Sequence, residues 1–288
     1  LISSFSSIVR NDVPQIYIKT AKRYICFNFA SRQIIQEVMT RDWANGAKRA
    51  VVMGATSGIG MEVALLLAKK GWKVGIAGRR EERLNHIMDS TDGIVCCKQI
   101  DITKENAPLL LNELIEELGG MDLYFHSSGI GWQNVALDIE KEMKTVETNG
   151  VGFTRMVTAA FYHFAENGGG QIAGISSIAR TAGLGAAPSY SATKRFQSHY
   201  LECLSQLSRM RKLNIHITEI RPGFVATDLL SGSRYPLQLK ASNVAKSIVK
   251  AVLKRKEIAT IDWRYRILVF FWRMIPRCVW VRLIRIHS

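Results

Sequence analysis

This sequence of 288 residues lacks long uninterrupted apolar runs. A membrane-spanning helix needs roughly 18 or more apolar residues in succession, and the longest run near the C-terminus extends only from Ile267 to Trp272. The N-terminal region also lacks the order of basic segment, apolar block and small-residue cleavage site that defines a signal peptide. We therefore expect neither a spanning helix nor secretion, and we expect a cytoplasmic protein.

Cysteine is scarce, and the few cysteines present are not arranged in pairs. The five are Cys26, Cys96, Cys97, Cys203 and Cys278. They lack the paired spacing of a metal site, and an odd count argues against a disulfide framework. We therefore expect reduced structural thiols, as in cytosolic proteins, and no bound metal.

Acidic residues are few at both ends of the chain, so the net charge of +15 is unevenly distributed. Residues 1–50 contain eight Lys or Arg and three Asp or Glu, and residues 263–288 contain six Arg and no acid. Residues 51–262 are nearly balanced, with 25 basic and 21 acidic residues. Basic ends fit an anionic membrane surface, on the inner face of the membrane, better than a nucleic-acid groove through the centre. They contain no recognition motif, so we do not expect nucleic-acid binding.

A hydrophobic fraction of 47% and a charged fraction of 22% are ordinary for a globular protein with a packed core. Residues 1–47 show no clear periodicity, whereas a strand-then-helix pattern begins abruptly at Lys48. Met39 is an alternative start, so the preceding segment is either an upstream reading extension or a loosely ordered arm. We expect an N-terminal extension over 1–47, a single folded domain over 48–262 and a basic apolar tail over 263–288.

From Ala50 onward, short apolar runs alternate with amphipathic stretches, a pattern typical of parallel strands joined by crossover helices. The expected strands lie near 50–54, 73–77, 94–100, 121–126, 170–175, 214–220 and 257–261. The expected helices lie near 58–70, 80–89, 104–118, 138–166, 187–211 and 241–255. The pattern predicts a doubly wound parallel sheet in a three-layer α/β/α arrangement.

A glycine-rich turn, Gly54-Ala55-Thr56-Ser57-Gly58-Ile59-Gly60, joins the first expected strand to the first expected helix. Gly54 permits a tight exit from the strand, Gly58 allows close approach to a pyrophosphate, and Gly60 allows the helix to pack on the sheet. The helix N-terminus then offers free N–H groups to phosphates. This context predicts a Rossmann-type fold with a dinucleotide site.

The second expected strand is followed by Gly78-Arg79-Arg80 rather than by an acid. A carboxylate at this position binds the ribose 2′-hydroxyl of NAD in many such folds. Arg79 and Arg80 suit a 2′-phosphate instead, because a guanidinium carries permanent charge on a planar fork. We expect NADP(H) rather than NAD(H); the alternative is two solvated arginines that open a helix.

Tyr190 and Lys194 are four residues apart and therefore share one face of the expected helix 187–211. Tyrosine has a pKa near 10 in water, so proton transfer at neutral pH needs a nearby positive charge that favours the phenolate. Lys194 can supply it. Ser177 follows the expected strand 170–175, where its hydroxyl can polarise a carbonyl.

With these residues, the stretch from 48 to 262 resembles the classical short-chain dehydrogenase/reductase family. The resemblance implies that Ser177, Tyr190 and Lys194 are catalytic and that Asn149 organises a proton-relay water. It places Asp101 beside the adenine. Tyr190 and Lys194 also bind the cofactor by this resemblance, with Lys194 holding the nicotinamide ribose. The other cofactor-binding positions that it implies are Gly54, Thr56, Ser57, Gly58, Ile59, Gly60, Ser128, Gly129, Pro222, Gly223, Val225 and Thr227.

Two positions depart from the family pattern. Met53 stands where the family usually has Thr, and His126-Ser127-Ser128-Gly129 replaces the common Asn-Asn-Ala-Gly. Neither change removes a catalytic group. We assign His126 a structural role and not a catalytic one.

The resemblance also implies a reaction and an assembly. Hydride passes between the nicotinamide and a carbonyl carbon while Tyr190 exchanges a proton with the oxygen, so a ketone or aldehyde and an alcohol interconvert. The family assembles through its long helices, here near 138–166 and 187–211, as a homodimer or homotetramer. The alternative from another class is a catalytically idle NADP-binding sensor or interaction protein.

The segment from Leu229 to Lys240 is the expected substrate lid, and its Leu, Tyr and Pro residues favour an apolar substrate. The tail interleaves aromatic residues with arginine, a composition that suits a membrane interface or a cover over the domain itself or a neighbouring subunit. Its arginines do not form a clean amphipathic stripe. Membrane contact favours a long-chain 3-oxo lipid or 3-ketosphinganine as substrate, followed by a steroid or bile-acid ketone.

Overall fold

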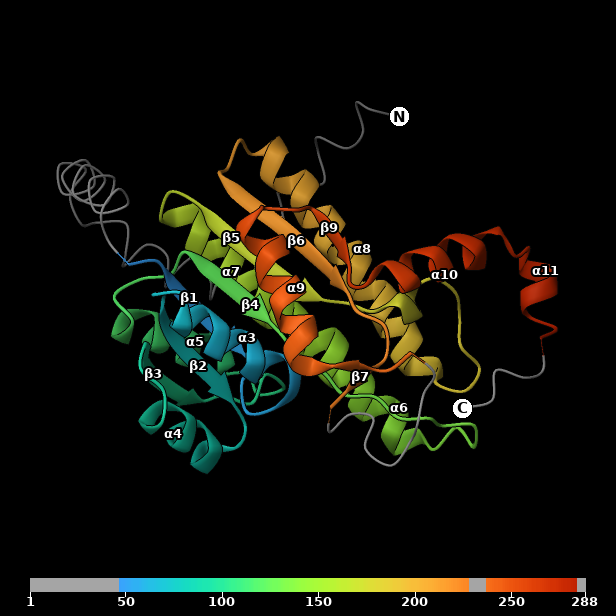
Figure 1. Ribbon diagram of the computed structural model, residues 1–288, viewed down its shortest axis with the longest axis horizontal. Coiled ribbons are helices and arrows are strands. Elements are labelled where there is room, and N and C mark those ends of the chain that lie inside the picture. The colour runs from blue at the N-terminus through green and yellow to red at the C-terminus, as the bar shows by residue number, and fades with distance from the viewer. Residues whose placement is uncertain (1–46, 228–236, 284–288) are drawn as a thin grey trace, which may run out of the picture. The chain divides into compact units, whose positions relative to one another are not determined.

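The computed structural model describes residues 47–227 and 237–283. Within them, seven parallel strands form one sheet in the order β3-β2-β1-β4-β5-β6-β9 (Figure 1). The strands are β1 (Arg49–Met53), β2 (Lys73–Gly78), β3 (Ile94–Gln99), β4 (Leu123–His126), β5 (Gly170–Ile175), β6 (Ile215–Arg221) and β9 (Ile258–Thr260). The doubly wound sheet predicted from the sequence is confirmed.

Helices cover both faces of the sheet because successive strand side chains point to opposite sides. On one face, Val52 packs with α3 (Gly58–Lys69), α4 (Glu81–Asp89) and α9 (Ala241–Leu253). On the other face, Val51 packs with α5 (Ala107–Glu117), α7 (Phe153–Glu166) and α8 (Pro188–Met210). The chain therefore forms the three layers expected for alternating strands and helices.

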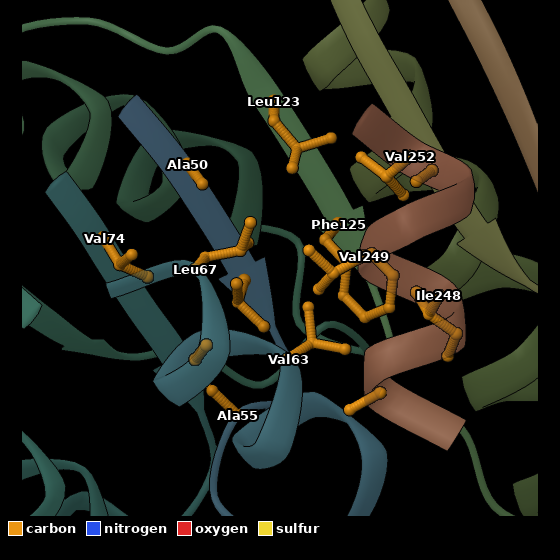
Figure 2. Packing of buried hydrophobic residues seen from close by; sticks show 14 of the residues in the cluster. Ala50, Ala55, Val63, Leu67, Val74, Leu123, Phe125, Ile248, Val249 and Val252 are labelled. Carbon is orange, nitrogen blue, oxygen red and sulfur yellow. The ribbon is translucent and has the colours of Figure 1, made fainter. Parts of the chain in front are cut away.

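The first of these interfaces is built from small and branched apolar side chains. Figure 2 shows Val63 and Leu67 of α3 facing Val249 of α9 across the end of Phe125 from β4. All four side chains are almost completely buried. This close packing holds α3, which follows the glycine-rich turn, against the sheet.

The expected long helix over 138–166 is interrupted. The chain forms α6 (Ile139–Val146), then the π-helical segment η2 (Glu147–Gly152), and then α7. Gly152 packs so closely on Ile102 that an added Cβ would lie 2.8 Å from its Cγ1. One turn with wider hydrogen bonding is a common way to re-aim a side chain at a functional site, and here that turn contains Asn149.

Three of the expected segments fall partly outside the described residues. Residues 1–46 of the N-terminal extension, 228–236 of the expected lid and 284–288 of the expected tail lie there. The end of the lid is described: β8 (Leu239–Lys240) pairs with β7 (Val225–Ala226). The lid segment therefore returns to the strand that follows the Pro222-Gly223 motif.

The tail forms two helices, α10 (Trp263–Met274) and α11 (Arg277–Trp280). Tyr265 is buried, and its hydroxyl accepts a hydrogen bond from Phe224 N at 3.1 Å and donates one to Leu237 O at 2.9 Å. Trp280 donates from Nε1 to Gly183 O at 2.8 Å. The tail thus packs on the domain, through Tyr265 at Phe224 and Leu237 and through Trp280 at Gly183. No helix in the described ranges is long and apolar enough to cross a membrane.

Candidate active site

The expected site residues come together at the carboxyl ends of the central strands. The glycine-rich turn follows β1, Ser128 follows β4, Ser177 follows β5 and Pro222 follows β6. In a doubly wound sheet this edge is where ligands bind, because the connections diverge there and leave a crevice. The topology therefore explains how residues distant in sequence share one site.

The glycines of the turn occupy positions where a larger residue cannot fit. Gly54 has φ of +89°, and an added Cβ would lie 2.6 Å from Ser128 N. A Cβ on Gly60 would overlap the Gly54 carbonyl oxygen. Gly58 begins α3 with φ of +57°, beside the Thr227 side chain. The result is a backbone cradle at a helix N-terminus, the arrangement that binds phosphates.

Arg80 lies against this cradle. Its Nη2 donates to Thr56 Oγ1 and to Ser57 Oγ, each at 2.7 Å, and its Nε donates to Thr56 Oγ1 at 3.1 Å. Arg79 is exposed, and its main-chain carbonyl accepts a hydrogen bond from Gln99 Nε2 at 3.0 Å. Arg80 therefore brings positive charge to the turn, while the charge of Arg79 acts on Asp101.

Asp101 follows β3 on the same edge of the sheet. Its Oδ1 accepts hydrogen bonds from Thr103 N at 3.0 Å and from Thr103 Oγ1 at 2.8 Å. Burial raises the pKa of Asp101, but these bonds and the charges of Arg79 and Lys104 outweigh burial and lower it. The side chain is therefore a fixed carboxylate acceptor.

Ser177 and Tyr190 form the centre of the expected catalytic group. Ser177 caps the short helix η3 (Ile178–Arg180), with Ala179 N donating to its Oγ at 3.1 Å. Burial raises the pKa of Tyr190, and a hydrogen bond from Ser177 opposes that rise. Gly131 lies so close that a Cβ there would overlap the Tyr190 ring. The phenol is thus held between Ser177 and the loop after β4.

Lys194 lies behind the Tyr190 ring, with Nζ 5.7 Å from the ring centroid. The ammonium donates to Ile175 O at 3.0 Å and to Gln197 Oε1 at 2.9 Å. Burial lowers the pKa of Lys194 to about 7. The sequence predicted a lysine that acts on the phenolate; the structure shows it stacked on the ring and anchored by two oxygen acceptors.

Gln197 continues this chain of hydrogen bonds. It is completely buried, and its Nε2 donates to the main-chain oxygen of Asn149 at 2.9 Å. One amide therefore joins the Lys194 ammonium to the carbonyl of Asn149. The sequence analysis missed Gln197, although its position three residues after Lys194 on the same helix face indicates contact.

The Asn149 side chain is fully used within the protein. Its Oδ1 accepts from Ile130 N at 2.9 Å, and its Nδ2 donates to Ile130 O at 2.7 Å and to Thr193 Oγ1 at 3.2 Å. These bonds fix the loop after β4 to the π segment and to α8. It is the main-chain carbonyl of Asn149, and not its side-chain amide, that is linked through Gln197 to Lys194.

His126 lies in the core at the end of β4. Its Nδ1 is 2.9 Å from the Tyr124 hydroxyl, and its ring packs edge-on against Phe153 with centroids 5.0 Å apart. Burial, and next the charge of Lys194, lowers the pKa of His126 to about 3. The imidazole is therefore neutral at physiological pH.

The remaining expected positions line the opposite wall. Pro222 accepts a main-chain hydrogen bond from Ile178 N at 3.0 Å, and this bond ties the loop after β6 to the helix that follows Ser177. Thr227 approaches Gly58 of the glycine-rich turn. Gly223 has no room for a Cβ because Tyr265 of the tail packs on it. The sequence missed this tyrosine as a contributor to the site wall.

A family model described as short chain dehydrogenase matches residues 48–236. The chain belongs to the short-chain dehydrogenase/reductase family. The match covers the glycine-rich turn, the Ser177 loop and the Tyr190 helix, and it confirms the resemblance drawn from the sequence. The protein is accordingly an oxidoreductase of this family.

Individual relatives are similar over most of the chain. An uncharacterized oxidoreductase of Myxococcus xanthus is 29% identical over 237 residues, or 80% of this chain and 93% of that protein. An actinorhodin polyketide ketoreductase solved with NADPH has a TM-score of 0.65 at 24% identity, covering 75% of this chain and 95% of its own. An alcohol dehydrogenase from the archaeon Thermococcus sibiricus, complexed with 5-hydroxy-NADP, has a TM-score of 0.66 at 22% identity, with 76% and 97% covered. The two structures support the same fold.

Proposed function

We propose that this protein is an NADP(H)-dependent reductase or dehydrogenase that interconverts a ketone or aldehyde and an alcohol on an apolar or lipid-like substrate. The observation that carries the proposal is the arrangement of Ser177, Tyr190 and Lys194. A half-buried tyrosine contacts a serine hydroxyl on one side and has a buried lysine behind its ring. This group lies on the same edge of the sheet as the glycine cradle.

The cradle fits a dinucleotide because it presents backbone at a helix N-terminus where side chains would clash. Arg80 and Arg79 would bind a 2′-phosphate, Asp101 the adenine, and Ser128, Gly129, Pro222, Val225 and Thr227 the remainder of the cofactor. The two solved structures described above contain NADPH or an NADP derivative, which supports NADP(H) over NAD(H). Bound here, the nicotinamide supplies or accepts the hydride at carbon.

The side chains handle the substrate oxygen. The Ser177 hydroxyl donates a hydrogen bond to the carbonyl, which polarises it toward attack. Tyr190 donates its proton to the oxygen during reduction and removes it during oxidation. Because its surroundings raise the pKa of Tyr190, the phenolate needs compensation, which Ser177 and the Lys194 ammonium supply.

A buried chain of hydrogen bonds holds Lys194 in place beside Tyr190. Lys194 Nζ, the Gln197 amide and the Asn149 carbonyl are linked by hydrogen bonds of 2.9 Å. Gln197 cannot pass a proton as water does, so we assign it a positioning role. It fixes the Lys194 ammonium beside Tyr190 and occupies the space between Lys194 and Asn149 O.

The exposed side chains of helix α10 favour peripheral contact with a membrane, as the composition of the tail also does. Most of its exposed apolar side chains recur at helical spacing and so share one face: Trp263, Ile267, Phe270, Phe271 and Met274, with Leu268 exposed beside it. Tyr265 points to the other side, into the domain.

Charge indicates which surface this face meets. Arg264, Arg266 and Arg273 lie on α10, and residues 263–283 contain no Asp or Glu. An interfacial helix of this kind buries its apolar face among lipid tails while its arginines reach anionic headgroups. Tyr265 links the helix to the loops that carry Phe224 and Leu237. Membrane docking would bring the substrate entrance close to lipid, which supports a long-chain ketone as substrate.

The test of this function is oxidation of NADPH and of NADH by the purified protein with ketones of increasing apolar length. The proposal predicts NADPH turnover that rises with chain length. Preference for NADH would overturn the role of Arg79 and Arg80. Binding of NADPH without turnover of any ketone or alcohol would favour the alternative of a catalytically idle sensor.

A further inference from the structure

A pocket of about 520 Å³ lies on the far side of α8 from the catalytic group. The loop 180–185 lines it together with Pro188, Ser191, Ala192 and Arg195 of α8. Ser191 lies about 100° around the helix from Tyr190, and the other three each precede a residue of the catalytic face by two positions, or about 200°. The pocket is therefore distinct from the site formed by Tyr190, Lys194 and Gln197.

Arg180 lines this pocket with hydrogen-bond donors that find no acceptor. Its side chain is 9% exposed, and its buried Nε and Nη1 have no hydrogen-bond partner. The hydroxyl of Thr181, the next residue along the pocket wall, is also buried without a partner. Buried donors left unpaired are costly, and those of a guanidinium especially so. Because the unpaired donors of Arg180 and Thr181 belong to residues that line one pocket, we expect a hydrogen-bond acceptor to bind there.

The only carboxylate that approaches Arg180 in the described residues is already occupied. Glu219 accepts from Arg221 Nε at 2.9 Å, from Arg221 Nη2 at 2.7 Å and from Ser176 Oγ at 2.5 Å. Arg180 Nε lies 3.7 Å from Glu219 Oε1, which is too far for a hydrogen bond. One carboxylate thus serves two largely buried guanidinium groups.

Further positive charge surrounds the pocket. Burial, and next the charge of Arg221, lowers the pKa of Arg180 to about 10, while Glu219 opposes this and Arg195 and Arg273 add to it. Arg195 itself lines the pocket. The region therefore combines excess positive charge with unpaired N–H and O–H donors, the two features that oxyanion sites share.

We infer that this pocket binds an oxyanion, a phosphate or carboxylate group, through Arg180, Arg195 and the Thr181 hydroxyl. The anion completes the hydrogen bonds of Arg180 and balances its charge. It can be a free small molecule or the headgroup of an anionic lipid, since Trp280 of the tail binds Gly183 on the same loop. The inference does not depend on the catalytic proposal, because none of these side chains belongs to the catalytic group.

The test measures thermal unfolding of the full chain at constant ionic strength, with chloride replaced by inorganic phosphate or by acetate. Saturating NADPH is present so that phosphate does not report on the dinucleotide cradle. NADPH alone is measured separately, so a failure of the cofactor proposal is seen independently. We expect at least one of the two anions to raise the Tm saturably over the millimolar range.

Two variants and a control assign the effect. Arg195→Gln changes an exposed residue and should keep the fold. It should weaken anion binding, measured by the rise in Tm, about tenfold, because a charged hydrogen bond is lost. Arg180→Gln removes the central donor and should abolish the effect. Arg209→Gln, on the same helix but paired with Glu257, should leave it unchanged. If Arg180→Gln does not fold, Thr181→Val with Arg195→Gln replaces it.

Vesicles distinguish the two sources of the anion. Binding to phosphatidic acid vesicles that Arg195→Gln weakens, with none to phosphatidylcholine, together with the phosphate effect, assigns a lipid headgroup. The phosphate or acetate effect without Arg195-dependent vesicle binding assigns a free anion. The inference is overturned if neither anion raises the Tm beyond chloride, or if Arg195→Gln and Arg180→Gln respond as the wild type does.

Discussion

The Gln197 amide donates to the main-chain oxygen of Asn149 at 2.9 Å while its own oxygen accepts from Lys194 at 2.9 Å. The ammonium is thereby fixed by a side chain three residues away on the same helix. Its other acceptor is Ile175 O, at the end of β5. The position of Lys194 behind Tyr190 thus depends on α8, β5 and the π segment together.

Replacing Gln197 by leucine should lower kcat about tenfold to a hundredfold, because a charged hydrogen bond to Lys194 is lost. The lysine pKa, already lowered to about 7 by burial, should fall further without this acceptor. The decline of the reduction rate with rising pH, which follows deprotonation of Lys194, should therefore begin at lower pH. The measurement is the pH profile of kcat for both proteins. Gln197→Glu should move the profile the other way, whereas a profile unchanged in Gln197→Leu would assign Gln197 to packing alone.

His126 should make the protein sensitive to acid. Its pKa is about 3 in the folded chain because of burial and then Lys194, against about 6.5 when unfolded. Between these values the unfolded chain binds a proton that the folded chain does not, so stability falls as pH falls. One such group contributes about 1.4 kcal/mol per pH unit well inside this window.

Denaturant unfolding between pH 7 and pH 4.5 measures this effect. His126→Asn should reduce the slope of the unfolding free energy against pH, whatever its effect on stability at pH 7. His199→Asn, which changes an exposed histidine, should keep the wild-type slope. Equal slopes in the wild type and His126→Asn would show that the imidazole is protonated in the folded protein.

Tyr265→Phe tests whether the tail supports the substrate side of the site. The change removes the hydrogen bonds to Phe224 N and Leu237 O but keeps the ring that packs on Gly223. We expect a loss of about 1–2 kcal/mol of unfolding free energy. We also expect the KM for the ketone to rise more, relative to wild type, than the KM for NADPH. Tyr162→Phe, at an exposed tyrosine of α7, is the control. If Tyr265→Phe keeps the wild-type KM values, the tail does not support the substrate side of the site.

The exposed face of α10 is tested by vesicle binding. Replacing Phe270 and Phe271, 62% and 61% exposed, by serine should reduce sedimentation with anionic vesicles at low salt by tenfold or more. Turnover of a short soluble ketone should not change. Leu109→Ser, 65% exposed on α5, is the matched control. No vesicle binding by the wild type, with self-association that the double variant abolishes, would assign this face to a second copy instead.

Much of the fold was predictable from the sequence because apolar runs and turn residues report local structure directly. The glycine-rich turn specified its own conformation, and strands β1 to β6 and β9 lie within two residues of their expected bounds. The expected site residues share an edge because the sheet topology leaves few alternatives.

What the sequence did not reveal depends on contacts between distant segments. The π segment at Asn149 arises from packing of Gly152 on Ile102 and from side-chain bonds to Ile130, which no local propensity encodes. Tyr265 is one of many aromatic residues in the tail, and only the fold shows that it is the buried one. Arg180 likewise looks like an ordinary surface charge until β6 places Arg221 and Glu219 beside it.

The central claim, that Tyr190 exchanges the proton with the substrate oxygen, is tested most directly by comparing NADPH binding and NADPH-dependent ketone turnover in wild type and Tyr190→Phe. The account predicts that the dissociation constant for NADPH changes less than about threefold, while kcat falls by about a hundredfold or more, the usual contribution of a general acid. Undiminished turnover by Tyr190→Phe would contradict the account.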